Sequence, residues 1–398
     1  MKKKIMHPAV LFSLIWFTVL LLHFIFKLTI LPDLFPLSTS TFLIFFIGTL
    51  AFSFGGFVQT IIWQKKNTEI TPACSGQSNI NLALRIILLV IIAVGLPFYI
   101  QAAYRVFLAS NIDNFFVGLR TELSYGSEDI GPLKYLVSFS YVIFAVNLYC
   151  YLTEKNRLNG ILLIANLLIS ITYAVFVTGR GLFLELVLIY LGLSYLLNKN
   201  FSVKKIFYLL IFFMLVFIAI GIMYGKGGSE KNTLKENIKP AAETTAVYLV
   251  SPLNALEWER HHHFQINYDG NHSLRFFMKI AEQLKWVPNA KVEELTQPFV
   301  FVPYPTNVYT IYSPYIKDFG NFYAWFMLFV FGFIHTFIYL KAISAKSIRY
   351  TVYFSFLLFP LFMSFFQDQY LSLFSTWLQV VIYFEGILFL NKFFVSPK

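Results

Sequence analysis

The segment TNVYTIYSPYIKDFGNFYAWFMLFVFGF, Thr306–Phe333, changes character near its middle. Its first half mixes Tyr, Pro and Asn with one Lys and one Asp, whereas the second half is almost entirely apolar. A long apolar run of this kind is typical of a helix inside a bilayer. The segment therefore indicates that polar and aromatic side chains are presented at the edge of a membrane.

The composition of the whole chain points the same way. Of its 398 residues, 58% are hydrophobic and 13% are charged, whereas a soluble domain carries about 25% charged residues. Ten apolar runs are long enough to cross roughly 30 Å of hydrocarbon as helices, so the sequence predicts an all-α polytopic membrane protein with about ten transmembrane helices. The predicted spans are Pro8–Leu28, Thr41–Trp63, Leu82–Phe98, Tyr135–Leu152, Leu158–Phe176, Leu182–Leu197, Ile206–Met223, Phe322–Leu340, Tyr350–Phe366 and Leu371–Leu390.

The distribution of basic residues predicts the orientation. With the N-terminus inside, the cytoplasmic segments carry fifteen Lys and Arg, while the short outer loops carry only Arg180. By the positive-inside rule both termini are cytoplasmic. The net charge of +11 does not indicate nucleic acid as a partner, because ten basic and ten acidic residues cancel between Tyr224 and Gly320.

This topology divides the chain into three parts. Residues 1–223 hold the first seven spans with a smaller outer loop at 99–134, residues 224–320 form a large outer loop, and residues 321–398 hold the last three spans. Within the large loop, HSLRFFMKIAEQLKW (His272–Trp286) predicts an amphipathic helix, with an apolar face formed by Leu274, Phe277, Ile280, Ala281 and Leu284. Such a helix suits a bilayer surface, and packing on the loop's own core explains the pattern equally well.

The turn TGRG, Thr178–Gly181, places Arg180 between two predicted spans at headgroup depth. A guanidinium there can bind a phosphate or pyrophosphate of a lipid through two parallel hydrogen bonds, although a snorkelling interfacial arginine is the alternative. Glu185 lies deeper in the next span. An acid inside a span is by default functional or paired, and we expect it to pair with Arg180.

The segment EWERHHHF, Glu257–Phe264, concentrates titratable groups in the large loop. Three consecutive histidines diverge on a helix, so a metal site is not expected. A neutral imidazole can accept a proton from a hydroxyl group near neutral pH, and one of His261, His262 or His263 is a candidate base. Arg260 and Arg275 are further candidates for binding phosphate.

The polar half of the opening segment supplies the remaining candidates. Asp318, two residues before Gly320, is a base, a hydroxyl acceptor or the cap of the eighth span. Tyr and Asn side chains suit a sugar, because they offer flat faces and polar atoms. Asn307, Tyr309 and Tyr312 are therefore candidates for binding glycan. Nearby prolines favour a re-entrant or extended turn here rather than a helix.

Three features together resemble the bacterial O-antigen polymerases of the Wzy type, also called oligosaccharide repeat-unit polymerases. They are the TGRG turn before an apolar span, the pattern TNVYT…DFG leading into an apolar helix that contains Gly332, and about ten spans with one long outer loop late in the chain. The resemblance in architecture covers nearly the whole chain, whereas the resemblance in motifs covers about twenty residues.

The resemblance implies a metal-independent glycosyltransferase with a GT-C-like membrane fold and no cofactor, acting at the periplasmic face of the bacterial inner membrane. Its substrate is an oligosaccharide linked to undecaprenyl pyrophosphate, and the growing glycan is transferred onto a new lipid-linked repeat unit. The resemblance also suggests a separate membrane protein that regulates chain length. In this setting Arg180 with Arg260 or Arg275 is expected to bind the pyrophosphate.

Two other functions remain open at the level of sequence. An O-antigen ligase, which transfers finished glycan to lipid A core, shares the topology and the chemistry. A flippase for the same lipid-linked sugar is a transporter, and such proteins usually have more spans and shorter loops than this chain.

Overall fold

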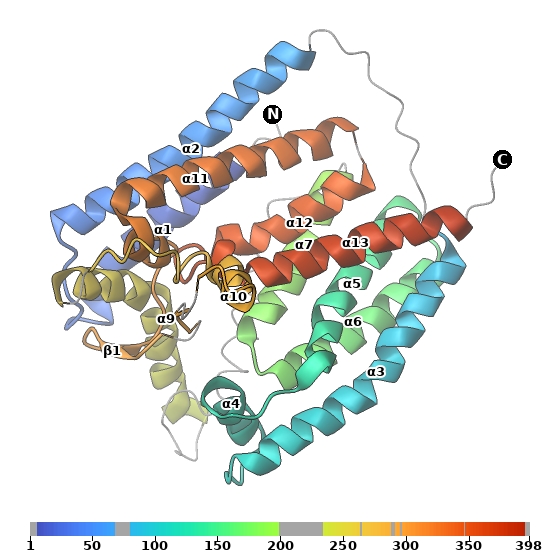
Figure 1. Cartoon of the computed structure of the whole chain (residues 1–398), viewed down its shortest axis with the longest axis horizontal. Coiled ribbons are helices and arrows are strands. Elements are labelled where there is room, and N and C mark those ends of the chain that lie inside the picture. The colour runs from blue at the N-terminus through green and yellow to red at the C-terminus, as the bar shows by residue number, and fades with distance from the viewer. Residues whose placement is uncertain are drawn as a thin grey trace. The chain divides into compact units, whose positions relative to one another are not determined.

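The computed structural model describes residues 6–67, 80–198, 234–262, 265–287, 291–294, 297–345 and 347–394. This part of the chain is built almost entirely of helices (Figure 1). In chain order its elements are α1 (Pro8–Thr29), α2 (Thr39–Asn67), α3 (Leu82–Ala109), α4 (Phe115–Tyr125), η2 (Gly131–Lys134), α5 (Tyr135–Thr153), α6 (Arg157–Val177), α7 (Arg180–Leu197), α9 (Leu234–His262), α10 (Arg275–Gln283), β1 (Val300–Phe301), β2 (Pro305–Thr306), α11 (Tyr312–Ala345), α12 (Ile348–Met363), η3 (Leu371–Leu373) and α13 (Phe374–Phe394).

Eight of these helical segments are long and apolar enough to cross a membrane, and they overlap eight of the ten predicted spans. The prediction of a helical, multi-pass membrane protein is confirmed at this level. The predicted span Tyr350–Phe366 corresponds to α12, an apolar helix of only 16 residues. The predicted span Ile206–Met223 lies outside the described residues.

The smaller outer loop begins later than the sequence suggested. We expected the third span to end at Phe98, but α3 continues to Ala109. Pro97 lies inside this helix, and the residues after it contain no glycine or further proline that would end the helix. Part of the remaining connection is also helical, as α4.

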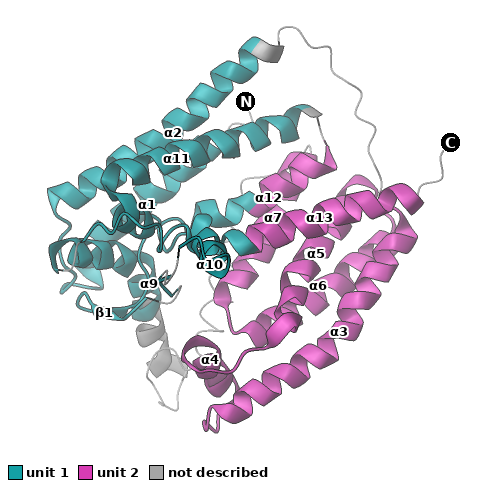
Figure 2. Ribbon diagram, viewed as in Figure 1, with its two compact units in different colours: residues 1–74, 234–345, 357–375 teal, residues 75–233, 346–356, 376–398 magenta. Residues whose placement is uncertain are grey.

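The described chain forms two compact units (Figure 2). Unit 1 contains residues 1–74, 234–345 and 357–375, and unit 2 contains residues 75–233, 346–356 and 376–398. The described part of the large loop therefore folds in the same unit as α1, α2 and α11 rather than as a separate domain. We describe each unit by itself.

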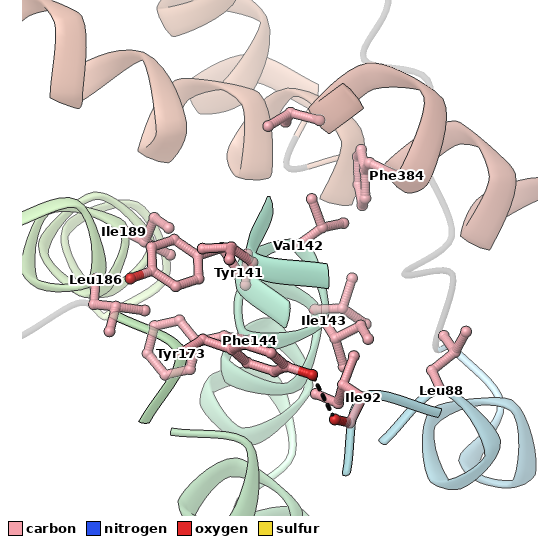
Figure 3. Packing of buried hydrophobic residues seen from close by; sticks show 14 of the residues in the cluster. Leu88, Ile92, Tyr141, Val142, Ile143, Phe144, Tyr173, Leu186, Ile189 and Phe384 are labelled. Atoms are coloured by element: carbon pink, nitrogen blue, oxygen red, sulfur yellow. Dashed lines mark hydrogen bonds between the residues drawn. The ribbon is translucent and has the colours of Figure 1, made fainter. Parts of the chain in front are cut away.

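Unit 2 has an apolar core centred on α5, whose residues from Ser140 to Cys150 are all buried. Figure 3 shows part of this core, where the Tyr173 hydroxyl donates a hydrogen bond of 2.9 Å to the Ile92 carbonyl. A polar network joins α5 to α6 within the core. The Asn147 amide donates to Asn166 at 3.0 Å, and Asn166 donates to the Ser140 carbonyl at 3.2 Å. These hydrogen bonds fix the register of the two helices in an otherwise apolar setting.

Unit 1 is organised around the contact between α2 and α11, which lie side by side (Figure 1). The backbones approach closely because each helix has a glycine at the contact. A β-carbon on Gly332 would lie against the Phe52 carbonyl oxygen, and one on Gly55 would lie against the Phe329 carbonyl oxygen. Small residues allow this approach between helices in a membrane.

The long helix α9 packs against α1 and the connection that follows it. Ala246 and Val250 of α9 form an apolar cluster with Leu31 and Leu34. One turn further, the Asn254 side-chain oxygen accepts a hydrogen bond from His23 Nε2 at 2.9 Å, and its amide donates one to the Phe35 carbonyl at 2.7 Å. The helix α9, which is the first described part of the large loop, is therefore packed onto unit 1.

A short hairpin that ends at Thr306 comes before the polar half of the opening segment, which leads into a helix. Strands β1 and β2 pair antiparallel, and α11 begins at Tyr312. The expected re-entrant or extended turn is therefore wrong from Tyr312 onward. Pro314 does not prevent the helix because it lies in the first turn, where its missing N–H has no helical partner to lose. The helix breaks instead at Gly320, whose φ of +81° suits glycine.

Gly332→Ala is expected to lower the stability of unit 1, because the added methyl group would force α2 and α11 apart. Overpacking of this kind costs about 1–3 kcal/mol. Gly386→Ala on α13 is the matched control, since nothing lies within 4 Å of its β-carbon position. Thermal unfolding of both variants in detergent measures the difference. Equal melting temperatures would contradict the close contact.

Candidate functional site

Unit 1 contains a polar hollow of about 450 Å³ on the described part of the large loop. A smaller pocket adjoins it and shares several wall residues, so we treat the two as one site, the polar hollow. The shared residues are His272, Gln297, Tyr309 and Lys317. The other residues that line it include Trp258, Glu259, Asn267, Arg275, Glu293, Asn307, Ser313, Asp368 and Ser372.

A buried ion pair forms one wall of the polar hollow. The Lys317 ammonium lies 2.5 Å from one carboxylate oxygen of Glu259, and the Ser313 hydroxyl donates to the other oxygen at 2.8 Å. Lys317 also donates to the Gln297 side chain at 3.2 Å and lies 5.3 Å from the centre of the Tyr309 ring. Several partners therefore hold the lysine in one position. A charged group in a binding site needs such support to keep its geometry.

Arg275, the first residue of α10, supplies a second positive charge to the polar hollow. Its Nε donates to the Glu293 carbonyl at 2.6 Å, and the side chain stays partly exposed. Its guanidinium therefore retains donors that can meet an anion.

His272 lines the polar hollow with these two cations. Its pKa is lowered to about 4, first by burial and then by the positive charges of Lys317 and Arg275. The imidazole is therefore neutral at pH 7, and its Nε2 accepts a hydrogen bond from Asn267 at 3.1 Å. A group with so low a pKa is a weak general base, so it is better suited to hydrogen bonding with a hydroxyl group.

Asp318 has a structural role in this arrangement. One oxygen accepts the His272 backbone N–H at 3.0 Å, and the other accepts the N–H and the hydroxyl of Ser273 at 2.7 and 2.5 Å. The Asp318 side chain is fully buried. Its oxygens are therefore already engaged in holding the start of α10, which leaves it poorly placed to act as a base, and it caps no residue of the eighth span.

Gly320 completes this connection. The helix break at Gly320 leaves the carbonyls of Lys317 and Asp318 without partners in the helix. They accept the backbone N–H groups of Asn267 and Tyr268, at 2.9 and 2.8 Å. The break at Gly320 therefore joins α11 to the segment before α10.

The candidate residues at the end of α9 are engaged elsewhere. Arg260 donates to the Thr41 hydroxyl at 2.7 Å, at the start of α2, and His261 lies 2.7 Å from Glu257. The Glu257 carboxylate also accepts the Ser38 N–H at 3.0 Å. His262 stacks on Trp258. None of these three candidates lines the polar hollow, and His263 lies outside the described residues.

The three candidate glycan-binding residues do not lie at one site. Asn307 and Tyr309 line the polar hollow. Tyr312 is fully buried, with its ring 5.1 Å from Trp16 and its hydroxyl donating to the Phe45 carbonyl at 3.2 Å. This placement leaves Tyr312 no surface for a sugar, and it packs α11 against α1 and α2 instead.

Arg180 and Glu185 both lie buried in unit 2, at the start of α7 and about one turn later. Within the described part of the chain no ion pair joins them, so the expected pairing is wrong. Residues five apart on a helix point to different sides, whereas residues three or four apart face each other. Arg180 makes other contacts.

Sequence reasoning missed Glu259, His272, Gln297, Lys317 and Asp368. Two of them are next to residues that were considered, since Glu259 precedes Arg260 and Lys317 precedes Asp318. Both are charged residues inside segments that already held candidates, and this charge was the signal that could have identified them. His272 stands alone in the sequence, and no pattern of neighbouring residues distinguishes it from the run His261–His263.

Comparison of the chain with protein-family models, with curated proteins and with solved structures gives no match.

Asp318→Asn is expected to destabilise the protein by about 1–3 kcal/mol, because an amide cannot accept all the hydrogen bonds that this buried carboxylate accepts. Asp113→Asn, at an exposed loop position, is the matched control. Thermal unfolding in detergent measures both. An unchanged melting temperature for Asp318→Asn would show that the carboxylate does not hold the loop.

His272 is expected to make the protein sensitive to acid. The unfolded chain takes up a proton near pH 6.5, whereas the folded chain does so only near pH 4. The stability that neutral His272 contributes is therefore complete above pH 6.5 and is lost as the pH falls through about 4. Thermal unfolding at several pH values should show a smaller loss for His272→Gln than for the wild type. Parallel curves would contradict the lowered pKa.

Proposed function

We propose that the protein is a polysaccharide polymerase that transfers a growing glycan from a lipid pyrophosphate onto a new lipid-linked repeat unit. The observation that carries the proposal is the polar hollow, which combines two cations with a carboxylate and with sugar-compatible side chains in a membrane protein. Glycosyl transfer from a pyrophosphate needs cations for the leaving group and an acceptor for the hydroxyl proton.

In the proposed reaction, Arg275 and Lys317 stabilise the charge that develops on the pyrophosphate as the bond from the anomeric carbon to its oxygen breaks. The acceptor sugar's hydroxyl oxygen forms the new bond to that carbon. Glu259, 2.5 Å from Lys317, takes the proton from the hydroxyl. The lipid pyrophosphate leaves with the bonding electron pair, so the charges balance.

The remaining wall residues bind the acceptor in this proposal. His272 is neutral and can donate or accept a hydrogen bond with a sugar hydroxyl. Asn307 and Tyr309 add an amide and an aromatic face to the same wall. These contacts orient the hydroxyl toward the anomeric carbon, and orientation is a large part of catalysis.

The proposal includes the setting that the sequence and the resemblance implied. The polar hollow faces the periplasm, both termini are cytoplasmic, and the protein lies in the bacterial inner membrane with about ten spans and a GT-C-like fold. The lipid is undecaprenyl, and a separate membrane protein regulates chain length. Arg180 of unit 2 remains a further candidate for binding pyrophosphate through its guanidinium.

Deletion of the gene in the organism of origin tests this function. Gel analysis of the surface polysaccharide should show lipid A core that carries one repeat unit, because ligation continues without polymerisation. Loss of a flippase or a ligase leaves lipid A core without any repeat unit. That second pattern would contradict the proposal and favour one of those two functions.

Complementation with Arg275→Ala is expected to restore little polymer, because removing one stabilising donor costs on the order of 10²–10³ in rate. Lys279→Ala is the matched control, since Lys279 is an exposed cation on the same helix and does not line the polar hollow. Gel analysis of polymer length and yield, with membrane protein levels checked by blotting, measures the effect. Equal polymer from both variants would remove Arg275 from the proposed mechanism.

A further inference from the structure

The helix α10 exposes apolar side chains on one side. Phe277, Ile280 and Leu284 are 44%, 38% and 53% exposed, respectively. At 100° per residue these three positions fall on one face of the helix. Exposed large apolar residues that are contiguous in this way mark a surface that meets something other than water.

The end of α10 extends this face. Lys285 adopts a left-handed conformation with φ +58°, and the Trp286 N–H donates to the Ala281 carbonyl at 2.8 Å. This is a Schellman ending, which folds the chain back beside the last turn of the helix. It carries two more exposed apolar residues, Trp286 at 76% and Val287 at 39%.

The position of α10 within unit 1 indicates what covers this face. The rings of Phe276 and Phe277 pack on Phe374, at centroid distances of 5.4 and 4.7 Å. Phe374 is the first residue of α13 and lies in one of the eight candidate spans. Because α10 contacts the end of a span, it lies at the level where that span leaves the hydrocarbon.

The charged residues of α10 fit the same environment. Lys279 and Glu282 project from the other sides of the helix, and Lys285 follows its last turn. Amphipathic helices of this kind lie in the plane of the interface with the apolar face in the acyl boundary. Tryptophan is enriched at that depth.

We propose that α10 and its ending, Arg275–Val287, lie in the bilayer interface with the apolar face against lipid. The occupant of this surface is the lipid bilayer, and the inference does not depend on the proposed reaction. It decides between the two interpretations that the sequence left open for this helix, since the apolar face is not packed on the loop's own core.

Spin labels on α10 test the proposal in the full-length protein, reconstituted in phosphatidylcholine–phosphatidylglycerol liposomes. Ile280→Cys and Leu284→Cys report the apolar face, and Glu282→Cys on the opposite side is the matched control, all in a background with Cys74→Ser and Cys150→Ala. The two apolar-face labels should be several-fold more accessible to oxygen and several-fold less accessible to a water-soluble nickel chelate than the control label.

Two results would overturn the proposal. Nickel access at 280 and 284 equal to that at 282 would place the face in water, and low access to both reagents would place it against protein, including a second copy of the chain. A second measurement needs no cysteine changes. Lipids brominated near the headgroup end of the acyl chain should quench wild-type fluorescence more than that of Trp286→Phe, and equal quenching would contradict the proposal.

Discussion

The close contact of α2 and α11 at Gly55 and Gly332 is the constraint on which unit 1 depends. Because the two backbones touch, the polar start of α11 is held against the start of α2, where Tyr312 donates to the Phe45 carbonyl. The first part of α11, before the break at Gly320, then presents Lys317 to the polar hollow, one turn beyond Ser313. A packing contact inside the membrane thus positions charged groups outside the hydrophobic helices.

Much of the architecture could be predicted from the sequence, because long apolar runs have few alternatives to a membrane-spanning helix. Errors occurred where local rules gave no unique answer. Pro97 lies inside α3 without ending it. Pro314 lies in the first turn of α11 without preventing that helix. The helix α11 breaks at Gly320, whose positive φ favours a glycine.

The candidate site was harder to predict, because its residues meet only in three dimensions. Glu259 and Lys317 pair across a long stretch of the chain, and nothing in the sequence links the segment EWERHHHF, which contains Glu259, to the opening segment, which contains Lys317. Asn307, Tyr309 and Arg275 were candidates because their residue types suit sugar or phosphate. In the structure all three line the polar hollow. Asp318 shows the opposite case, in which a carboxylate of suitable chemistry is fully engaged by the backbone of a neighbouring loop.

The amide network of unit 2 has a consequence for how the chain is inserted. An unpaired asparagine amide is costly in hydrocarbon, and among the described residues the side-chain amide of Asn147 in α5 donates to Asn166 of α6. The turn Glu154–Asn156 is too short to let the two helices separate widely. During biosynthesis α5 and α6 should therefore leave the translocation channel together as a helical hairpin, with the amide pair already made.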